Sequence, residues 1–177
     1  MDLRLVAQLE QQAHHFSQGG MIATLLAGSE PRAAAPATWS SGIVASPYGA
    51  FGALAPAFAH GAEHTLVDLG FGQFTFSRTW WDEVRAMDLA AALASYARPL
   101  LAMAGTDDDL VAPAASAALA CAAASQDATV MEFAGADHIF NVLGPGTDVS
   151  AAVIETTVDW FAERLLRTGA QIAEGAR

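Results

Sequence analysis

The second half of the chain alternates short apolar runs with helical segments. RPLLAMAG, at residues 98–105, is a short apolar run bounded by Pro99 and Gly105 and fits a buried parallel strand, and ATVMEF, at residues 128–133, predicts a second strand. Residues 113–124 are rich in alanine and predict a helix, and residues 149–166 predict a closing amphipathic helix. This strand–helix–strand–helix order predicts an α/β fold in which a parallel sheet is flanked by helices.

The first half gives a less regular pattern. Apolar residues at helical spacing predict a helix over residues 2–13, and a buried helix is predicted over residues 19–27. A strand is predicted around GIVAS, within residues 36–45. The remaining segments predict a loop or broken helix over 46–63, a hairpin or extended excursion over 65–77, and a helix, interpreted as two pieces, over 79–96.

The net charge of the chain excludes some classes of binding partner. The chain has 19 acidic residues against 8 basic ones, all of them arginine, and a formal net charge of −11. This balance argues against nucleic acid and anionic membranes as partners. The N-terminal sequence MDLRLVAQLEQQ lacks the apolar core of a signal peptide, and no long apolar stretch is free of Gly, Pro and charge. We therefore expect a cytoplasmic protein.

Polar residues follow both predicted strands of the second half. Asp107, Asp108 and Asp109 come after the first strand, and Asp137 and His138 come after the second. The carboxyl ends of parallel strands meet at one edge of the sheet, so a carboxylate and an imidazole from these two loops can reach one another.

A serine with unusual neighbours completes the set. Ser17 is followed by Gln18, Gly19 and Gly20 directly before a predicted helix. Two glycines in a first helical turn are unfavourable, at about 1 kcal/mol each relative to alanine, which suggests that the backbone is pressed against another segment. A serine, an imidazole and a carboxylate are the parts of a nucleophilic triad. The alternative, left open, is that Ser17 only caps the helix.

Three separated motifs resemble the α/β-hydrolase family of serine enzymes. Ser17-Gln18-Gly19-Gly20 resembles the family's nucleophile elbow, GTDDDLV its acid loop, and GADHIFNV its histidine loop. The order serine, aspartate, histidine along the chain also matches. The resemblance covers most of the chain, is strongest over residues 99–165, and among branches is greatest to bacterial serine esterases and dienelactone-hydrolase-like enzymes.

The resemblance implies roles for individual residues. Ser17 would be the nucleophile, His138 the base, and Asp108 the orienting acid, with Gly105 and Val111 setting a register that favours Asp108 over its two neighbours. The backbone of Gln18 would supply one oxyanion donor. The implied activity is hydrolysis of small-molecule carboxylic esters through an acyl-enzyme, and no cofactor is implied.

Aromatic residues of the middle segment have two interpretations. Trp80 and Trp81, with Phe71, Phe74 and Phe76, either line a substrate pocket or belong to the core. The family resemblance places this segment near the site. We select Phe76, Trp80 and Trp81 as candidate pocket residues.

The resemblance also has departures. The position two before the serine is His15, where the family has a small residue, and the family's N-terminal half, including the loop that donates one oxyanion N–H, is not matched. We therefore interpret 1–177 as a single partial domain, with an excursion near the site at 46–97 and a frayed tail at 167–177. An exposed sheet edge would favour self-association. The competing hypothesis is a catalytically inactive fragment or accessory chain that assembles with a partner.

A metal site is not expected. HGAEH, residues 60–64, matches the pattern H-x-x-E-H of a zinc signature, but that signature needs a helix to place both histidines on one face. Gly61 and the surrounding loop-like composition argue against a helix there.

Overall fold

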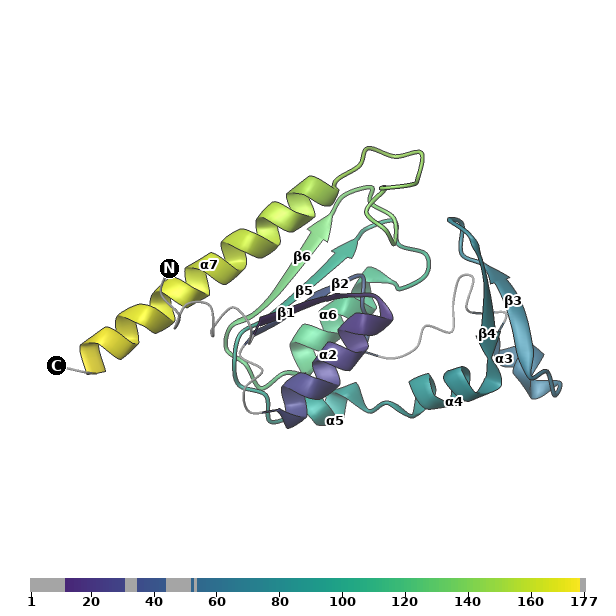
Figure 1. Cartoon of the computed structure of the whole chain (residues 1–177), viewed down its shortest axis with the longest axis horizontal. Helices are drawn as coiled ribbons and strands as arrows, with labels where there is room; N and C mark the ends of the chain where they lie inside the picture. The colour runs from purple at the N-terminus through teal and green to yellow at the C-terminus, as the bar shows by residue number, and fades with distance from the viewer. Residues whose placement is uncertain (1–11, 31–34, 44–51, 53, 176–177) are drawn as a thin grey trace.

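The computed structural model describes residues 12–30, 35–43, 52 and 54–175, and Figure 1 shows how they are arranged. Four parallel strands form the main sheet in the order β1-β2-β5-β6. The strands are β1 (Gln12–Phe16), β2 (Ala35–Trp39), β5 (Leu100–Gly105) and β6 (Ala128–Phe133). The predicted α/β class with a parallel sheet is confirmed.

Helices cover both faces of this sheet. Helix α7 (Ser150–Gly175) lies on one face, and α2 (Gln18–Ser29), α5 (Leu89–Leu93) and α6 (Pro113–Ala122) lie on the other (Figure 1). Strand β5 is buried along its whole length because its side chains alternate between the two layers. Leu101 and Met103 pack with Val153 and Trp160 of α7, whereas Leu100 and Ala102 pack with the opposite layer.

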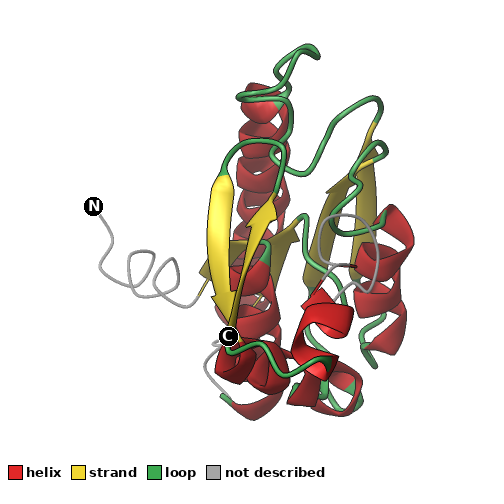
Figure 2. Ribbon diagram, turned by 90° about the vertical axis from the view of Figure 1, so that its right-hand side faces the viewer, coloured by secondary structure: helices red, strands yellow, loops and turns green. Residues whose placement is uncertain are grey.

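The middle of the chain forms a separate hairpin unit. Strands β3 (His64–Asp68) and β4 (Gln73–Ser77) pair antiparallel, with helix α3 (Leu54–Ala59) before them and α4 (Arg78–Ala86) after them. Leu54, Phe58, Val67 and Trp81 make a small core of their own. Figure 2 shows the hairpin standing in front of the main sheet. The hairpin and the two-piece helix predicted from the sequence are both confirmed.

The structure corrects the sequence predictions in the first half. Residues 12–13, placed in a helix by the sequence pattern, belong to strand β1, which leads directly into Ser17; the rest of that predicted helix lies outside the described residues. Strand β2 is APATW, at the start of the predicted range 36–45; Gly42 and Ile43 of the GIVAS run are not in a strand, and residues 44–46 lie outside the described residues. Both strands are defined by their pairing, Gln12 with Ala35 through Phe16 with Trp39, rather than by local propensity.

The C-terminal end also differs from expectation. Helix α7 continues to Gly175, whereas fraying is predicted after Leu166. The segment beyond Leu166 contains Arg, Ala, Gln and Glu, which favour helix, and the helix ends at a glycine. Among the helices that the structure describes, none is long and apolar enough to span a membrane.

Candidate active site

Ser17 occupies a sharp turn between strand β1 and helix α2. Its backbone has φ 51° and ψ −121°, a combination that a residue with a side chain rarely adopts. Its amide donates a hydrogen bond to the Trp39 carbonyl at 2.7 Å, which ties the turn to the end of β2. A strained serine at the carboxyl end of a strand, directly before a helix, has the geometry of a nucleophile elbow.

The two glycines after the elbow have different surroundings. A Cβ atom on Gly20 would lie 2.6 Å from both Cβ and Oγ of Ser41, which is closer than real atoms approach. A Cβ on Gly19 would lie 3.5 Å from His15 Cβ, an ordinary contact. Gly20 is therefore the position that allows α2 to approach the segment after β2, and Gly19 leaves room beside His15.

These surroundings predict opposite outcomes for two matched substitutions. Gly19→Ala and Gly20→Ala each add one methyl group to the first turn of α2, with the same gain in helix propensity of about 1 kcal/mol. Overpacking costs about 1–3 kcal/mol, so only Gly20→Ala is expected to lower the free energy of unfolding. Urea denaturation of the two variants measures this difference. Equal stabilities would contradict the close contact between Gly20 and Ser41.

Asp108 lies in the loop after β5 and its carboxylate is fully removed from solvent. Oδ1 accepts hydrogen bonds from the amides of Leu110 at 2.9 Å and Val111 at 2.8 Å, which leaves Oδ2 directed at the histidine loop. Asp107 and Asp109 are exposed. The structure therefore distinguishes Asp108 from the aspartates on either side.

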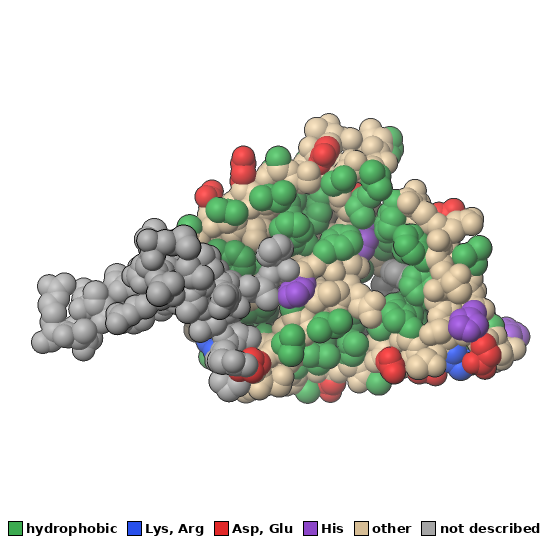
Figure 3. Space-filling view, viewed as in Figure 1, with side chains coloured by type: hydrophobic (Ala, Val, Ile, Leu, Met, Phe, Trp, Pro, Cys, Tyr) green, Lys and Arg blue, Asp and Glu red, His purple; other side chains and the backbone are tan. Residues whose placement is uncertain are grey.

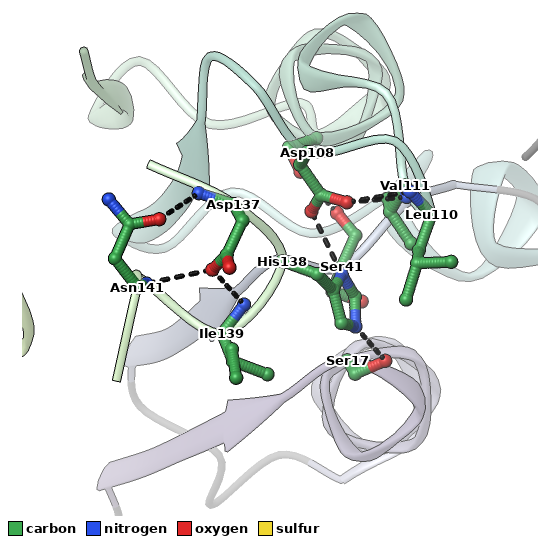
Figure 4. Close-up of polar contacts among 10 residues, drawn as sticks. Ser17, Ser41, Asp108, Leu110, Val111, Asp137, His138, Ile139 and Asn141 are labelled. Atoms are coloured by element: carbon green, nitrogen blue, oxygen red, sulfur yellow. Dashed lines mark hydrogen bonds and ion pairs between the residues drawn. The ribbon is translucent and has the colours of Figure 1, made fainter. Parts of the chain in front are cut away.

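His138 lies between the acid and the serine. Its Nδ1 is 2.9 Å from Asp108 Oδ2, and its Nε2 is 3.0 Å from Ser17 Oγ (Figure 4). An ionised carboxylate only accepts hydrogen bonds, so Nδ1 carries the proton, and in the neutral imidazole Nε2 is then free to accept one from the serine hydroxyl. The three side chains that the sequence pattern selected, on three different loops, thus form one continuous hydrogen-bonded chain.

A second network holds the loop that carries His138. Asp137 Oδ1 accepts from the amides of Ile139 at 3.0 Å and Asn141 at 2.7 Å, while Asn141 Oδ1 accepts from the Asp137 amide at 2.9 Å (Figure 4). The amide group of Asn141 also donates to the carbonyls of Gly135 and Thr147, both at 3.0 Å. Asn141 has a φ of 63°, so this network fixes a tight, unusual turn. Asn141 lies within the GADHIFNV segment, but the sequence pattern did not predict a role for it.

The other predicted site residues are Gln18, Phe76, Trp80 and Trp81, and they differ in how close they lie to the three hydrogen-bonded side chains. Gln18 is the first residue of α2, so its amide has no partner within the helix, and its side-chain oxygen accepts from Trp80 Nε1 at 3.0 Å. The Phe76 and Trp80 rings pack together with centroids 4.6 Å apart. Trp81 is buried in the core of the hairpin unit, which is the alternative that the sequence left open.

Two aromatic rings contact the histidine instead. The Phe71 ring stacks on His138 with centroids 6.5 Å apart and an interplanar angle of 6°, and the Phe16 ring lies 5.1 Å from it. Phe71 is at the tip of the β3–β4 hairpin, so the excursion reaches the site through this residue. No sequence motif predicts the contact between Phe16 and His138. The position of Phe16 directly before Ser17 was the one indication that it lies near the site.

The histidines of the HGAEH segment do not share a helix. His60 lies in the turn after α3, and His64 is the first residue of β3. Within the described part of the chain, no group of three or more His, Cys, Asp or Glu side chains is arranged to hold a metal ion.

Comparisons with known proteins identify the fold. No protein-family model and no curated protein sequence matches the chain. Among solved structures, the esterase domain of a Rhodothermus marinus protein is similar at 23% identity with a TM-score of 0.58, over 84% of this chain and 59% of that one. Monoacylglycerol lipase from Paleococcus ferrophilus is similar at 19% identity with a TM-score of 0.62, over 84% of this chain and 66% of that one.

A mouse protein has a similar fold and is also covered only in part. Alpha/beta hydrolase domain-containing protein 10 is similar at 15% identity with a TM-score of 0.66, over 87% of this chain and 62% of that one. The chain therefore has an α/β-hydrolase fold, and it spans about three fifths to two thirds of the length of these structures.

Proposed function

We propose that the protein is a serine hydrolase that cleaves carboxylic esters through an acyl-enzyme. The observation that carries this proposal is the continuous chain from Ser17 Oγ through His138 to the buried Asp108 carboxylate, with Ser17 on a strained elbow. Several proteins with similar folds have names that include esterase or lipase, which supports the same chemistry.

In the proposed mechanism, each of the three side chains has a distinct role. Ser17 Oγ attacks the ester carbonyl while His138 Nε2 accepts its proton, and the imidazolium then protonates the departing alcohol. Asp108 stabilises the imidazolium and holds the ring so that Nε2 points at the serine. Water then attacks the acyl-serine with His138 again acting as base, which releases the carboxylic acid and restores Ser17.

Helix α2 provides electrostatic support for the negative charge on the carbonyl oxygen. The Gln18 amide is the first N–H of the helix, directly after the nucleophile, and it lies at the positive end of the helix dipole. We assign this amide as one oxyanion donor. Such donors typically contribute a factor of about 10²–10³ to kcat.

Covalent labelling tests the proposal without requiring the natural substrate. A fluorophosphonate should label the wild-type protein once, on Ser17, and should fail to label Ser17→Ala, because only a serine activated by a base attacks phosphorus at a useful rate. Ser29→Ala is the matched control, since Ser29 is exposed on the same helix and bonds only to helix carbonyls. Intact-mass and peptide mass spectrometry measure the adduct.

The opposite result has a defined meaning. A folded wild-type protein that no phosphonate labels, with ester cleavage equal in wild type and Ser17→Ala, would refute the hydrolase proposal. That result would favour the competing hypothesis of an inactive chain that assembles with a partner.

A further inference from the structure

An apolar cavity of about 320 Å³ lies beside the candidate triad. This volume is at the lower end of the range for small-molecule pockets, which is about 300–1,000 Å³. Figure 3 shows hydrophobic side chains on both sides of the hollow between the hairpin unit and the main sheet. The walls of the cavity include Phe16, Trp39, Phe71, Val142, Leu143 and Val153.

The cavity wall is continuous with the residues that surround the nucleophile. Phe16 is the residue before Ser17, and both Phe16 and Phe71 pack against the His138 ring. A second cleft, of about 330 Å³, is lined by His138 itself. Phe71, Ile139 and Leu143 line both spaces, so the apolar cavity and the cleft at the histidine are neighbours.

The chemistry of the wall selects an apolar ligand. Among the described residues that line the cavity, two have polar groups in their side chains, Ser150 and Trp39. The Trp39 indole N–H donates to Thr157 Oγ1 at 3.1 Å. Val142 and Leu143 are 51% and 74% exposed, although apolar side chains of this size are usually covered. An apolar group in the cavity would cover part of both side chains.

We infer that this cavity binds the acyl chain of the substrate, and that the preferred substrates are esters of medium-length aliphatic acids such as hexanoic acid rather than acetic acid. The inference rests on the proposed function, since it places the acyl carbonyl at Ser17 Oγ. The chain then extends past Phe16 and Phe71 toward Val153, and the alcohol leaves on the side of the cleft lined by His138.

Chain-length dependence tests the assignment. Each methylene that becomes buried is expected to raise kcat/KM by about fourfold, so burial of two of the additional methylenes of hexanoate is enough for nitrophenyl hexanoate to exceed nitrophenyl acetate by about tenfold or more. The double variant Val142→Ser/Leu143→Ser should reduce this hexanoate-to-acetate ratio by at least about threefold. The acetate rate is the internal reference for each variant, and thermal melting checks that the double variant is folded.

Leu66→Ser provides the matched control. Leu66 is an apolar side chain on β3 that is 60% exposed, and it belongs to neither cavity wall. Its substitution should leave the hexanoate-to-acetate ratio at the wild-type value. A similar fall in this ratio for Leu66→Ser would mean that surface apolarity in general, rather than this cavity, sets the preference, and would overturn the inference.

Two further results separate this inference from the proposed function. If hydrolysis requires Ser17 but acetate is preferred, or the double variant keeps the wild-type ratio, the acyl assignment is overturned while the hydrolase proposal stands. If ester cleavage at every chain length is independent of Ser17, both are overturned.

Discussion

Replacing Asp108 with asparagine is expected to lower kcat for the hydrolysis of nitrophenyl esters by about 10⁴. The Asp108 carboxylate accepts two backbone hydrogen bonds and a third from His138, so its position beside the imidazole is fixed. An asparagine amide keeps the shape but carries no charge, and its NH₂ group, directed at His138 Nδ1, would favour the tautomer in which Nε2 carries the proton. The imidazole could then no longer accept the proton of Ser17. Steady-state kinetics on an activated ester measures the loss.

The neighbouring aspartates provide controls of the same chemistry. Asp107 and Asp109 are exposed, and neither carboxylate is hydrogen-bonded to His138. Asp107→Asn and Asp109→Asn should therefore change kcat no more than a few fold, with the same loss of one negative charge. A variant of Asp107 or Asp109 that is as impaired as Asp108→Asn would show that the acid has been assigned to the wrong position.

The strands and loops of the second half could be predicted because their signals are local. The run that forms β5 is apolar and buried throughout, the run that forms β6 is mostly apolar with Thr129 and Glu132 in it, and each is followed by polar residues at the point where the strand ends. A short apolar run of this kind predicts a strand from a single sequence, without knowledge of its pairing partners. The spacing of Asp108 and His138 after these strands then follows from the parallel arrangement.

Strands β1 and β2 could not be predicted in the same way. The β1 sequence QAHHF contains two adjacent histidines, and the β2 sequence APATW contains a proline and two alanines, which have little preference for strands. Their conformation is stabilised by pairing with each other and, for β2, with β5. Such pairing joins residues far apart in the sequence and leaves no local periodicity.

The contact between Phe71 and His138 could not be predicted from the sequence either, because it also depends on tertiary packing. Phe71 is at the tip of a hairpin whose alternation predicts the strands but not the direction in which the hairpin leans. The sequence therefore named Phe71 among several aromatic residues and gave no ground to prefer it over Phe76 or Trp81. Tertiary packing makes that choice.

Gly105→Ala is expected to destabilise the protein by about 3 kcal/mol or more and to reduce ester hydrolysis with it. Gly105 ends β5, and a Cβ there would overlap the Ala136 carbonyl group, 2.6 Å from its carbon and 2.8 Å from the Asp137 oxygen. Both obstacles are backbone atoms, so no side-chain rotation can relieve the overlap. The denaturant midpoint of unfolding and kcat/KM for an activated ester measure the two effects.

The position of the overlap links stability to activity. The Asp107 amide donates to the Ala136 carbonyl at 2.9 Å, a bond that joins the loop of Asp108 to the loop of His138. To admit the methyl group, residues 136–137 must move away from β5, and this movement would lengthen the 2.9 Å contact between His138 and Asp108. Gly19→Ala makes the same chemical change where the added Cβ meets only an ordinary contact of 3.5 Å, so it should not lower the stability. If Gly105→Ala unfolds at the wild-type denaturant concentration, the two loops do not approach each other as closely as the proposed triad requires.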